Sequence, residues 1–112
     1  PDETDDNLKN LIAVSEKNNI DGFICCNTSI EHTYPNPGGM SGAMLTKKAE
    51  NIQKKVAQLK QEKSSLIASG GVMSASDVKI RLTNSADLVQ LYTGYIFKGN
   101  SLLKKALKIS SS

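Results

Sequence analysis

Aromatic side chains are scarce in this sequence, which contains no tryptophan and only one histidine. Aromatic residues make up 4% of the chain, too few for the stacking platforms that bind single-stranded nucleic acid. No group of His, Cys, Asp and Glu residues has the spacing of metal ligands. The sequence therefore predicts neither a nucleic-acid partner nor a metal site.

Cysteine is limited to the adjacent pair Cys25 and Cys26. Neighbouring residues of a strand point to opposite faces, and the pair lacks the spacing of a zinc site or of a redox motif. We therefore expect a reduced, intracellular chain in which the cysteines fill the core. One of them could still contact a ligand if it stands at the end of a strand.

Long apolar runs are also missing. No stretch approaches the ~20 apolar residues of a membrane-spanning helix, and no signal-peptide pattern opens the chain. A membrane anchor would have to lie outside this segment. The start at Pro1, without an initiator methionine, suits a processed or partial chain.

The excess of positive charge is small. The 14 basic and 11 acidic residues leave a formal net charge of +3 over 112 residues. The lysines are spread along helix-like stretches, so solvated helix faces are a better interpretation than a surface for a polyanion. This length is sufficient for one small domain with a core.

Apolar periodicity predicts helices and strands in alternation. The expected elements are a helix from Asp5 or Asp6 to about Asn18, a strand at 20–26, a helix from Thr46 or Lys48 to Lys63, a strand at 65–69, a helix opened by Ser74, a strand at 87–92, and a short closing helix around 103–107 before a frayed end at 110–112. This order predicts a parallel sheet whose ligand site lies at the carboxyl ends of the strands.

Two local patterns refine the expected helices. Leu8, Leu11 and Ile12 are spaced to share one apolar face of the first helix. Ser74, followed three residues later by Asp77, resembles a capping box in which Asp replaces the preferred Glu or Gln. We expect the first pattern to face the core and the second to begin a helix.

Two of the predicted strands end in small-residue turns, which contain Gly70-Gly71 and Tyr92-Thr93-Gly94. Glycine lets the backbone approach a ligand and expose its N–H groups, although either sequence alone could be a plain tight turn. Together they fit the end of a (β/α)8 barrel where the loops after the last two strands commonly hold a phosphate. A complete barrel needs roughly 250 residues, so this chain would be less than half of one.

The predicted loop at 27–42 is rich in Pro, Gly and Asn, and loops of this length are more often functional or disordered than neutral. Asn27 and Thr28 stand at a strand end, where Asn27 could recognise an amide, imide or carboxylate or could simply terminate the strand. The segment at 38–42 could be a flexible linker or could pack against a flat ligand. His32 lacks a partner for a triad or a metal site and is expected to be solvent-exposed.

Four segments, considered together, resemble one protein family. The segments are 21–29 (DGFICCNTS), 38–42 (GGMSG), 67–72 (IASGGV) and 88–93 (LVQLYT). In order and spacing they are similar to the C-terminal part of the quinone-dependent, class 2 dihydroorotate dehydrogenases, and the resemblance covers nearly the whole chain. It implies an α/β fold in which residues 1–112 form the C-terminal portion of a TIM (β/α)8 barrel around FMN.

The resemblance also implies an activity for the whole protein. Dihydroorotate would be oxidised to orotate in pyrimidine synthesis, and FMN would pass the electrons to a quinone. The enzyme would be a peripheral protein of the bacterial inner membrane or the mitochondrial inner membrane. The remainder of the barrel or a companion chain would have to supply the catalytic serine, a flavin-contacting lysine and the helices that meet membrane and quinone.

The resemblance implies a role for residues of each segment. Asn27 and Thr28 would contact the orotate ring and its carboxylate, and Cys26 stands where many members have Thr or Ser near the flavin. Ser41 and Gly42 would pack near the flavin ring. The phosphate of FMN would be bound by Gly70, Gly71, Tyr92 and Thr93.

No residue of this segment replaces the catalytic base, and Ser41 does not take that role. We therefore expect the isolated chain not to turn over dihydroorotate. Two alternatives remain open from the sequence. One is another phosphate-binding or FMN-dependent TIM-barrel enzyme, and the other is a non-catalytic half-barrel that associates through its exposed sheet edge.

Overall fold

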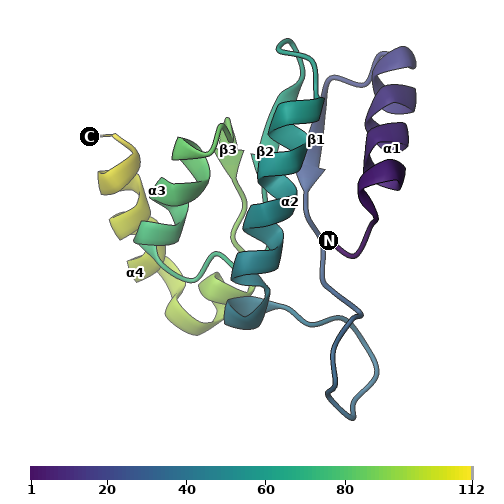
Figure 1. Ribbon diagram of the computed structural model, residues 1–112. Helices are drawn as coiled ribbons and strands as arrows, with labels where there is room; N and C mark the ends of the chain where they lie inside the picture. The colour runs from purple at the N-terminus through teal and green to yellow at the C-terminus, as the bar shows by residue number, and fades with distance from the viewer. Residues whose placement is uncertain (112) are drawn as a thin grey trace.

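Helices and short strands alternate along residues 1–111, which a computed structural model describes (Figure 1). The elements are α1 (Asp5–Lys17), β1 (Gly22–Cys25), the 3₁₀ turn η1 (Gly42–Leu45), α2 (Thr46–Leu59), β2 (Ser65–Ala68), α3 (Ala75–Thr83), β3 (Leu88–Val89) and α4 (Thr93–Ser110). Each strand is followed by a helix, as the apolar periodicity predicts.

The strands form one sheet in the order β1-β2-β3, and both pairings are parallel. Figure 1 shows α2 lying against one face of this sheet, with α1 on one side and the pair α3 and α4 on the other. Because all the strands run in the same direction, their carboxyl ends meet at one edge. The parallel α/β sheet expected from the sequence is confirmed.

The covered face of the sheet carries the main core. Leu66 and Ala68 of β2 are fully buried beneath α2, and Ile12 of α1 and Val56 of α2 pack in the same region. A second apolar cluster joins the loop after β2 to α3 and α4 through Val72, Val78 and Ala106. The two clusters hold the helices on one side of the sheet.

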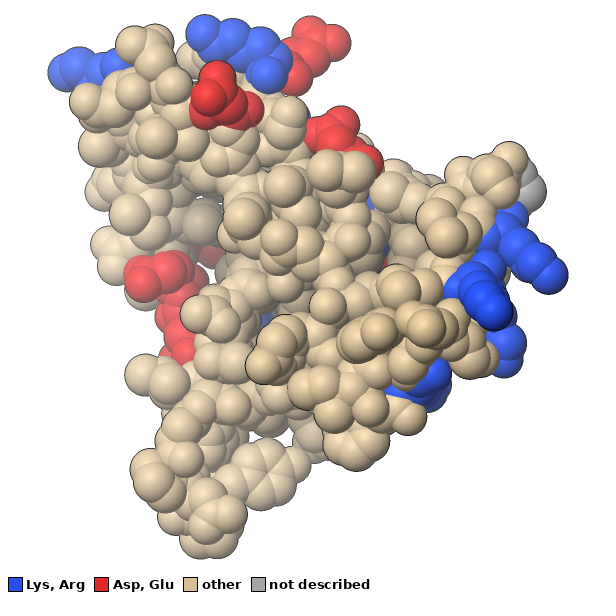
Figure 2. All heavy atoms as spheres, turned by 180° about the vertical axis from the view of Figure 1, so that it is seen from behind, with Lys and Arg blue, Asp and Glu red and all other residues tan. Residues whose placement is uncertain are grey.

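The other face of the sheet presents a row of apolar side chains. Ile24 pairs in register with Ile67, and Ile67 with Leu88, so the three lie side by side across the sheet. Ile24 and Leu88 are each 62% exposed. Figure 2, seen from the side opposite to α2, shows charged side chains mainly around the rim of this face. A closed barrel would place such a layer in its interior.

The first helix differs from its expected burial. Leu8 and Ile12 are buried, whereas Leu11, predicted to share their face, is 55% exposed. Helix α1 packs on α2 along a narrow stripe, and nothing in residues 1–111 covers the flank that carries Leu11. The helix begins at Asp5 and its N-cap is Thr4, in place of Asp5 or Asp6, because the hydroxyl of Thr4 accepts the hydrogen bond from the Asn7 N–H.

Other boundaries also move. Helix α2 ends at Leu59 instead of Lys63, since the carboxylate of Glu16 accepts hydrogen bonds from the Gln61 N–H and the Ser64 hydroxyl and holds that segment in a turn.

The C-terminal elements also differ from their predicted bounds. Strand β3 is limited to two residues, and α4 extends from Thr93 to Ser110 with a kink at Gly99. Ser110 thus closes the helix, while Ser112 of the expected frayed end lies outside the described residues.

The cap of α3 matches the sequence pattern. The Ser74 hydroxyl accepts a hydrogen bond from the Asp77 N–H at 3.1 Å. The Asp77 carboxylate in return accepts from the N–H of Met73 at 2.9 Å, one residue before the position of a standard capping box. This cap fixes the start of α3 directly after the glycine turn that follows β2.

Candidate functional site

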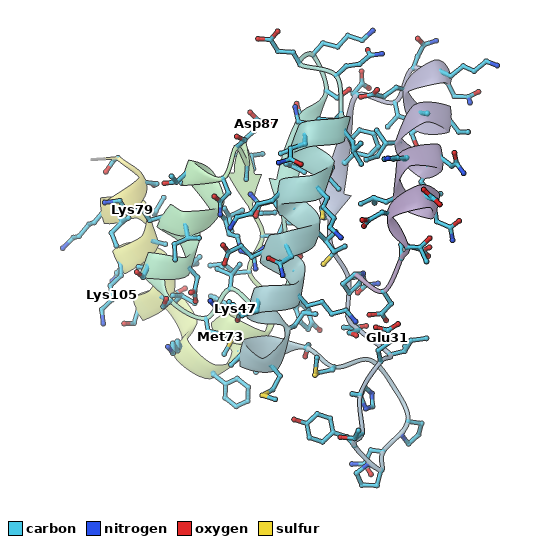
Figure 3. The ribbon with its side chains drawn as sticks, viewed as in Figure 1. Glu31, Lys47, Met73, Lys79, Asp87 and Lys105 are labelled. Carbon is cyan, nitrogen blue, oxygen red and sulfur yellow. The ribbon has the colours of Figure 1, made fainter. Side chains whose placement is uncertain are left out.

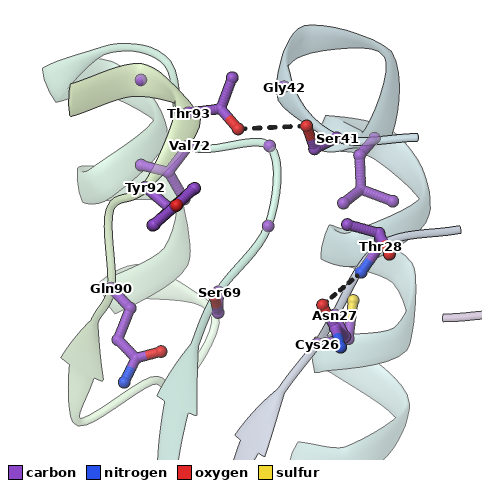
Figure 4. A pocket seen from close by; sticks show the side chains of 14 residues that line it. Cys26, Asn27, Thr28, Ser41, Gly42, Ser69, Val72, Gln90, Tyr92 and Thr93 are labelled. Atoms are coloured by element: carbon purple, nitrogen blue, oxygen red, sulfur yellow. Dashed lines mark hydrogen bonds between the residues drawn. The ribbon is translucent and has the colours of Figure 1, made fainter. Parts of the chain in front are cut away.

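A cavity of about 300 Å³ lies at the carboxyl ends of the strands (Figure 4). It brings together every site residue predicted from the sequence. The predicted lining residues are Cys26, Asn27, Thr28, Ser41, Gly42, Gly70, Gly71, Tyr92 and Thr93, and the additional ones are Leu45, Ser69, Val72, Gln90 and Gly94. The geometry therefore places these segments at one site, while the roles assigned to the residues stay predictions.

Backbone hydrogen bonds just beyond the strands fix the positions of three residues at the floor of the cavity. The Cys26 N–H donates to the Ser69 carbonyl at 2.9 Å, and the Ser69 N–H donates to the Cys25 carbonyl at 2.7 Å. The Gln90 N–H donates to the carbonyl of Ala68 at 2.8 Å. Cys26, Ser69 and Gln90 therefore stand side by side where β1, β2 and β3 end (Figure 4).

Asn27 and Thr28 form the polar wall that follows β1. The side-chain oxygen of Asn27 accepts a hydrogen bond from the Thr28 N–H at 2.9 Å. This contact gives the Asn27 oxygen a local structural role, as the strand-end interpretation expects. The Asn27 NH2 group retains two donors for a ligand, so one side chain accommodates both interpretations.

The long loop after Thr28 folds back on itself. Ser29 and Met40 form an antiparallel bridge, with N–H to carbonyl distances of 3.1 and 2.7 Å. A Cβ added to Gly39 would lie 1.9 Å from the Thr28 hydroxyl oxygen, so the return strand of the loop contacts the Thr28 side chain directly. The segment at 38–42 is thus held by contacts with residues 28 and 29 instead of forming a free linker, and its Ser41 and Gly42 line the cavity, while packing against a flat ligand stays a prediction.

The turn after β2 needs glycine at both positions. Gly70 and Gly71 have φ angles of 92° and 68°, a region that L side chains rarely adopt. A Cβ on Gly71 would lie 2.4 Å from the backbone nitrogen of Thr46. The Thr46 hydroxyl donates to the Gly71 carbonyl at 2.5 Å, which ties the turn to the start of α2.

The start of α4 closes the opposite wall. Thr93 donates a hydrogen bond from its hydroxyl to the Ser41 hydroxyl at 3.2 Å (Figure 4). A Cβ on Gly94 would lie 2.3 Å from the Val72 carbonyl oxygen, so this helix begins in close contact with the glycine turn. Tyr92 provides no side-chain cap, and the first N–H groups of the helix lack intrahelical acceptors.

The two cysteines differ in their electrostatic surroundings. The hydrogen bond between the thiols, together with burial, raises the pKa of Cys25. The same hydrogen bond lowers the pKa of Cys26 to about 7 against the opposing effect of burial, with further contributions from the positive charges of the amino terminus at Pro1 and of Arg81. Cys25 faces the core, as predicted, while Cys26 lines the cavity.

Arg81 of α3 is a residue of this region that the sequence did not single out. Its side chain is 1% exposed and lies behind the glycine turn, where it donates to the Gly70 carbonyl at 2.9 Å. On an amphipathic helix an arginine is ordinarily assigned to the solvated face, so no pattern marks it. Ser69 and Gln90 directly follow the observed strands β2 and β3, but the sequence placed both inside longer predicted strands, so neither was marked as a strand-end residue.

The outer part of the long loop lies away from the cavity. Figure 3 shows Glu31 at the neck of this loop, where its carboxylate pairs with Lys48 of α2 at 2.5 Å. The His32 ring is half-buried and its Nε2 lies 2.8 Å from the Gly38 carbonyl, so the expectation of a solvent-exposed histidine is wrong. The ring is held by the fold of the loop.

Two features, a cluster of metal ligands and a membrane-spanning helix, are absent from residues 1–111. Within residues 1–111, no three His, Cys, Asp or Glu side chains are grouped as they would be around a metal ion. No helix in the same range has the length and apolarity to cross a membrane.

Comparison with known proteins places the chain in a family. A model for dihydroorotate dehydrogenase matches residues 1–109. The chain is 38% identical, over 99% of its length, to a dihydroorotate dehydrogenase (quinone) of Dichelobacter nodosus and covers 35% of that protein. It is 39% identical, over 82% of its length, to the protein of the same name from Halorhodospira halophila and covers 29% of it.

Solved structures agree with this assignment. A dihydroorotate dehydrogenase from Eimeria tenella, crystallised with ferulenol, superposes with a TM-score of 0.87 at 25% identity over 99% of this chain and 32% of that one. The ligand-free form of the Eimeria tenella enzyme gives a TM-score of 0.89 over 98% and 33%. The chain spans about a third of the length of these relatives. It belongs to the dihydroorotate dehydrogenase family and has the fold of one part of that family's (β/α)8 barrel.

Proposed function

We propose that this chain forms the part of a quinone-dependent dihydroorotate dehydrogenase that holds the FMN phosphate and one side of the orotate. The observation that carries this proposal is the convergence of the glycine turn, the start of α4 and the Asn27-Thr28 wall on one cavity. Residues 1–112 would be the C-terminal, phosphate-binding portion of the barrel.

The end of the cavity formed by the glycine turn and α4 has the donors that a phosphate needs. The N–H groups of Gly71 and Val72 have no protein acceptor among the described residues, and the N–H groups that open α4 are uncapped. Thr93 adds a hydroxyl. Since side chains are excluded at Gly71 and Gly94 by close backbone contacts, a phosphate can approach these donors closely.

The Asn27-Thr28 wall suits orotate, which carries a ring amide, ring carbonyls and a carboxylate. The Asn27 NH2 group would donate to a ring carbonyl or to the carboxylate, and the Thr28 hydroxyl can donate or accept. Cys26 at the floor would contact the flavin edge with a thiol, a weaker hydrogen-bonding group than the hydroxyl that many relatives have there.

The flavin would supply the hydride chemistry, and the residues of this chain would bind and orient the reactants. Ser41 is a wall residue in this scheme and not the catalytic base, and its hydroxyl accepts the hydrogen bond of Thr93. The base that removes the proton from dihydroorotate would come from the remainder of the barrel. The exposed row of Ile24, Ile67 and Leu88 supports a completed barrel, since closure would bury it.

Electron transfer to quinone and attachment to a bacterial or mitochondrial inner membrane belong to this proposal for the whole protein. The relatives named above carry the quinone activity in their names. Within the described residues of this chain no membrane-spanning helix provides the attachment.

The test is a pair of titrations on the protein purified at its natural length. We expect FMN to bind more tightly than riboflavin, and orotate to change the absorbance of the bound flavin. Binding of FMN with no response to orotate would favour another FMN-dependent barrel enzyme. A stable oligomer that is indifferent to both ligands in sedimentation would favour a non-catalytic module.

A further inference from the structure

We propose that Arg81 is a positioning residue that orients the peptide groups of the Gly70-Gly71 turn toward a phosphate. This inference rests on the proposed function and adds to it a residue that lies outside the cavity. It concerns how the fold orients the backbone N–H groups that would bind an anion.

The guanidinium of Arg81 is embedded in the protein. One nitrogen, Nη2, donates to the Gly70 carbonyl at 2.9 Å and to the Thr46 carbonyl at 3.1 Å. The other, Nη1, donates to the side-chain oxygen of Gln53 at 3.3 Å. The planar fork of an arginine therefore links the turn after β2 to the first turn of α2.

Gln53 holds the backbone of Arg81 as well as its side chain. Its amide nitrogen donates to the Arg81 carbonyl at 2.7 Å and to the Asn84 carbonyl at 3.0 Å. Gln53 is fully buried. The position of the guanidinium is thus set from both ends and does not depend on solvent or on a flexible partner.

The hydrogen bonds determine which way the peptide groups of the turn point. Arg81 holds the carbonyl of Gly70, and the Thr46 hydroxyl holds the carbonyl of Gly71. In a trans peptide the N–H points opposite to the carbonyl. Arg81 and Thr46 are not lining residues of the cavity, so the carbonyls turn away from it and the N–H groups of Gly71 and Val72 turn toward it.

The charge of Arg81 forms no ion pair with a carboxylate among residues 1–111. Burial lowers its pKa, and the negative charges of Glu50 and Asp77 oppose this shift only in part. Because burying a cation is costly, an anion bound across the turn would offset the part of that cost that the protein leaves. A phosphate dianion in the cavity fits both the orientation of the N–H groups and this incompletely compensated charge.

The experiment compares FMN with riboflavin, which lacks the phosphate. In the protein at its natural length, Arg81→Gln should weaken FMN binding by about tenfold, the loss expected for a charge-assisted interaction. Riboflavin binding should change by less than about twofold, because the ring contacts are untouched. Thr46→Val removes only the hydroxyl that donates to the Gly71 carbonyl. It should lower the ratio of FMN affinity to riboflavin affinity by about threefold.

Val56→Ala serves as the matched control for a general loss of stability. It removes buried methyl groups from the core beneath α2 without contacting the turn, so the ratio of FMN to riboflavin affinity should stay as in the natural protein. Equal losses of both flavins in the Arg81→Gln and Thr46→Val proteins would overturn the inference. If Arg81→Gln does not fold, Thr46→Val and Arg81→Lys decide it, and an unchanged ratio in both overturns it.

The two proposals fail in different ways. A natural protein that binds FMN and riboflavin equally would overturn the proposed phosphate site and this inference with it. A natural protein that prefers FMN, with variants that keep this preference, would overturn the role of Arg81 alone.

Discussion

At the scale of single residues, the polar wall after β1 divides its functions between atoms. The oxygen of the Asn27 amide accepts a hydrogen bond from the backbone at Thr28, which leaves the NH2 group as a donor for a ligand. In the proposed site such a residue would support the strand end and a ligand at the same time. Its substitution should therefore affect substrate binding more than the flavin.

Asn27→Ala is expected to weaken orotate binding by about tenfold or more, because the donated hydrogen bonds to a charged ligand are lost. FMN affinity should stay within about twofold, since the phosphate site is formed by other segments. Titration with orotate, followed by the absorbance of bound flavin, measures the first effect, and a separate titration with FMN measures the second. Asn10→Ala on the exposed surface of α1 is the control, and equal orotate affinity in the two variants would contradict the prediction.

Cys26 should be the reactive cysteine of this chain. Its pKa is lowered to about 7, so its thiolate, the nucleophilic form, is well populated at neutral pH, whereas an ordinary thiol titrates near ~8.5. Alkylation by iodoacetamide should rise with pH around that lower value and should slow when FMN covers the cavity. Cys26→Ser should abolish the rapid alkylation at neutral pH and leave only the slow reaction of the buried Cys25. A midpoint at the ordinary value would show that the neighbouring thiol does not stabilise the thiolate.

The lining of the cavity was predictable from sequence because strand ends and glycine turns are local patterns. Cys26, Gly70 and Thr93 each follow a strand, and parallel strands bring such positions together. Arg81 was not predictable. Its burial depends on carbonyls supplied by Gly70 and Thr46, which are distant in sequence.

At the scale of elements, the turn after β2 is the most constrained segment of the site. Gly71 combines a positive φ with a close contact to the start of α2. These two constraints can be separated, because another glycine of the chain has a positive φ without a close neighbour. That residue is Gly99, at the kink of α4.

Gly71→Ala should abolish tight FMN binding, because the new methyl group would force the turn away from Thr46. Gly99→Ala should cost about 1–2 kcal/mol of stability through its φ angle alone and leave FMN affinity unchanged. Denaturant unfolding and FMN titration of both variants provide the comparison. Similar FMN affinities in the two proteins would refute the requirement for close approach at position 71.

Helix α4 shows where element prediction fails. Gly94 and Gly99 favour an interpretation as breakers, and only the segment around 103–107 was expected to be helical. Helical backbone begins at Thr93 and includes Gly94, which lies against the Val72 carbonyl, whereas Gly99 leaves the helical conformation and forms the kink between two helical segments. A tertiary contact determines the outcome at Gly94, which local propensity does not contain, while Gly99 interrupts the helix as its propensity favours.

At the scale of the whole molecule, ion pairs connect segments far apart in sequence. Lys48 of α2 pairs with Asp2 and with Glu31 at the neck of the long loop. The hydrogen bond from Lys48, followed by that from Ser29, holds the pKa of Asp2 well below its ordinary value of 3.8. The cluster fastens the segment before α1 to the loop that encloses the cavity.

Acid should release this cluster. A carboxyl whose pKa is lower in the folded state stabilises the fold above its unfolded pKa and ceases to do so as the pH falls through the folded value. Stability should therefore decline below about pH 4, where Asp2 of the unfolded chain takes up a proton. Lys48→Met should flatten this part of the profile in denaturant titrations between about pH 2 and 5. An unchanged slope would mean that the exposed pair contributes nothing.

The exposed row formed by Ile24, Ile67 and Leu88 has a consequence for how mutations in this chain are judged. In the 112-residue chain alone, a polar substitution such as Ile24→Thr should improve solubility, because it breaks an uncovered apolar strip. In a completed barrel the same change would bury a hydroxyl in the interior and lower stability. A screen for soluble expression of the isolated chain would thus favour variants that are less stable in a completed barrel.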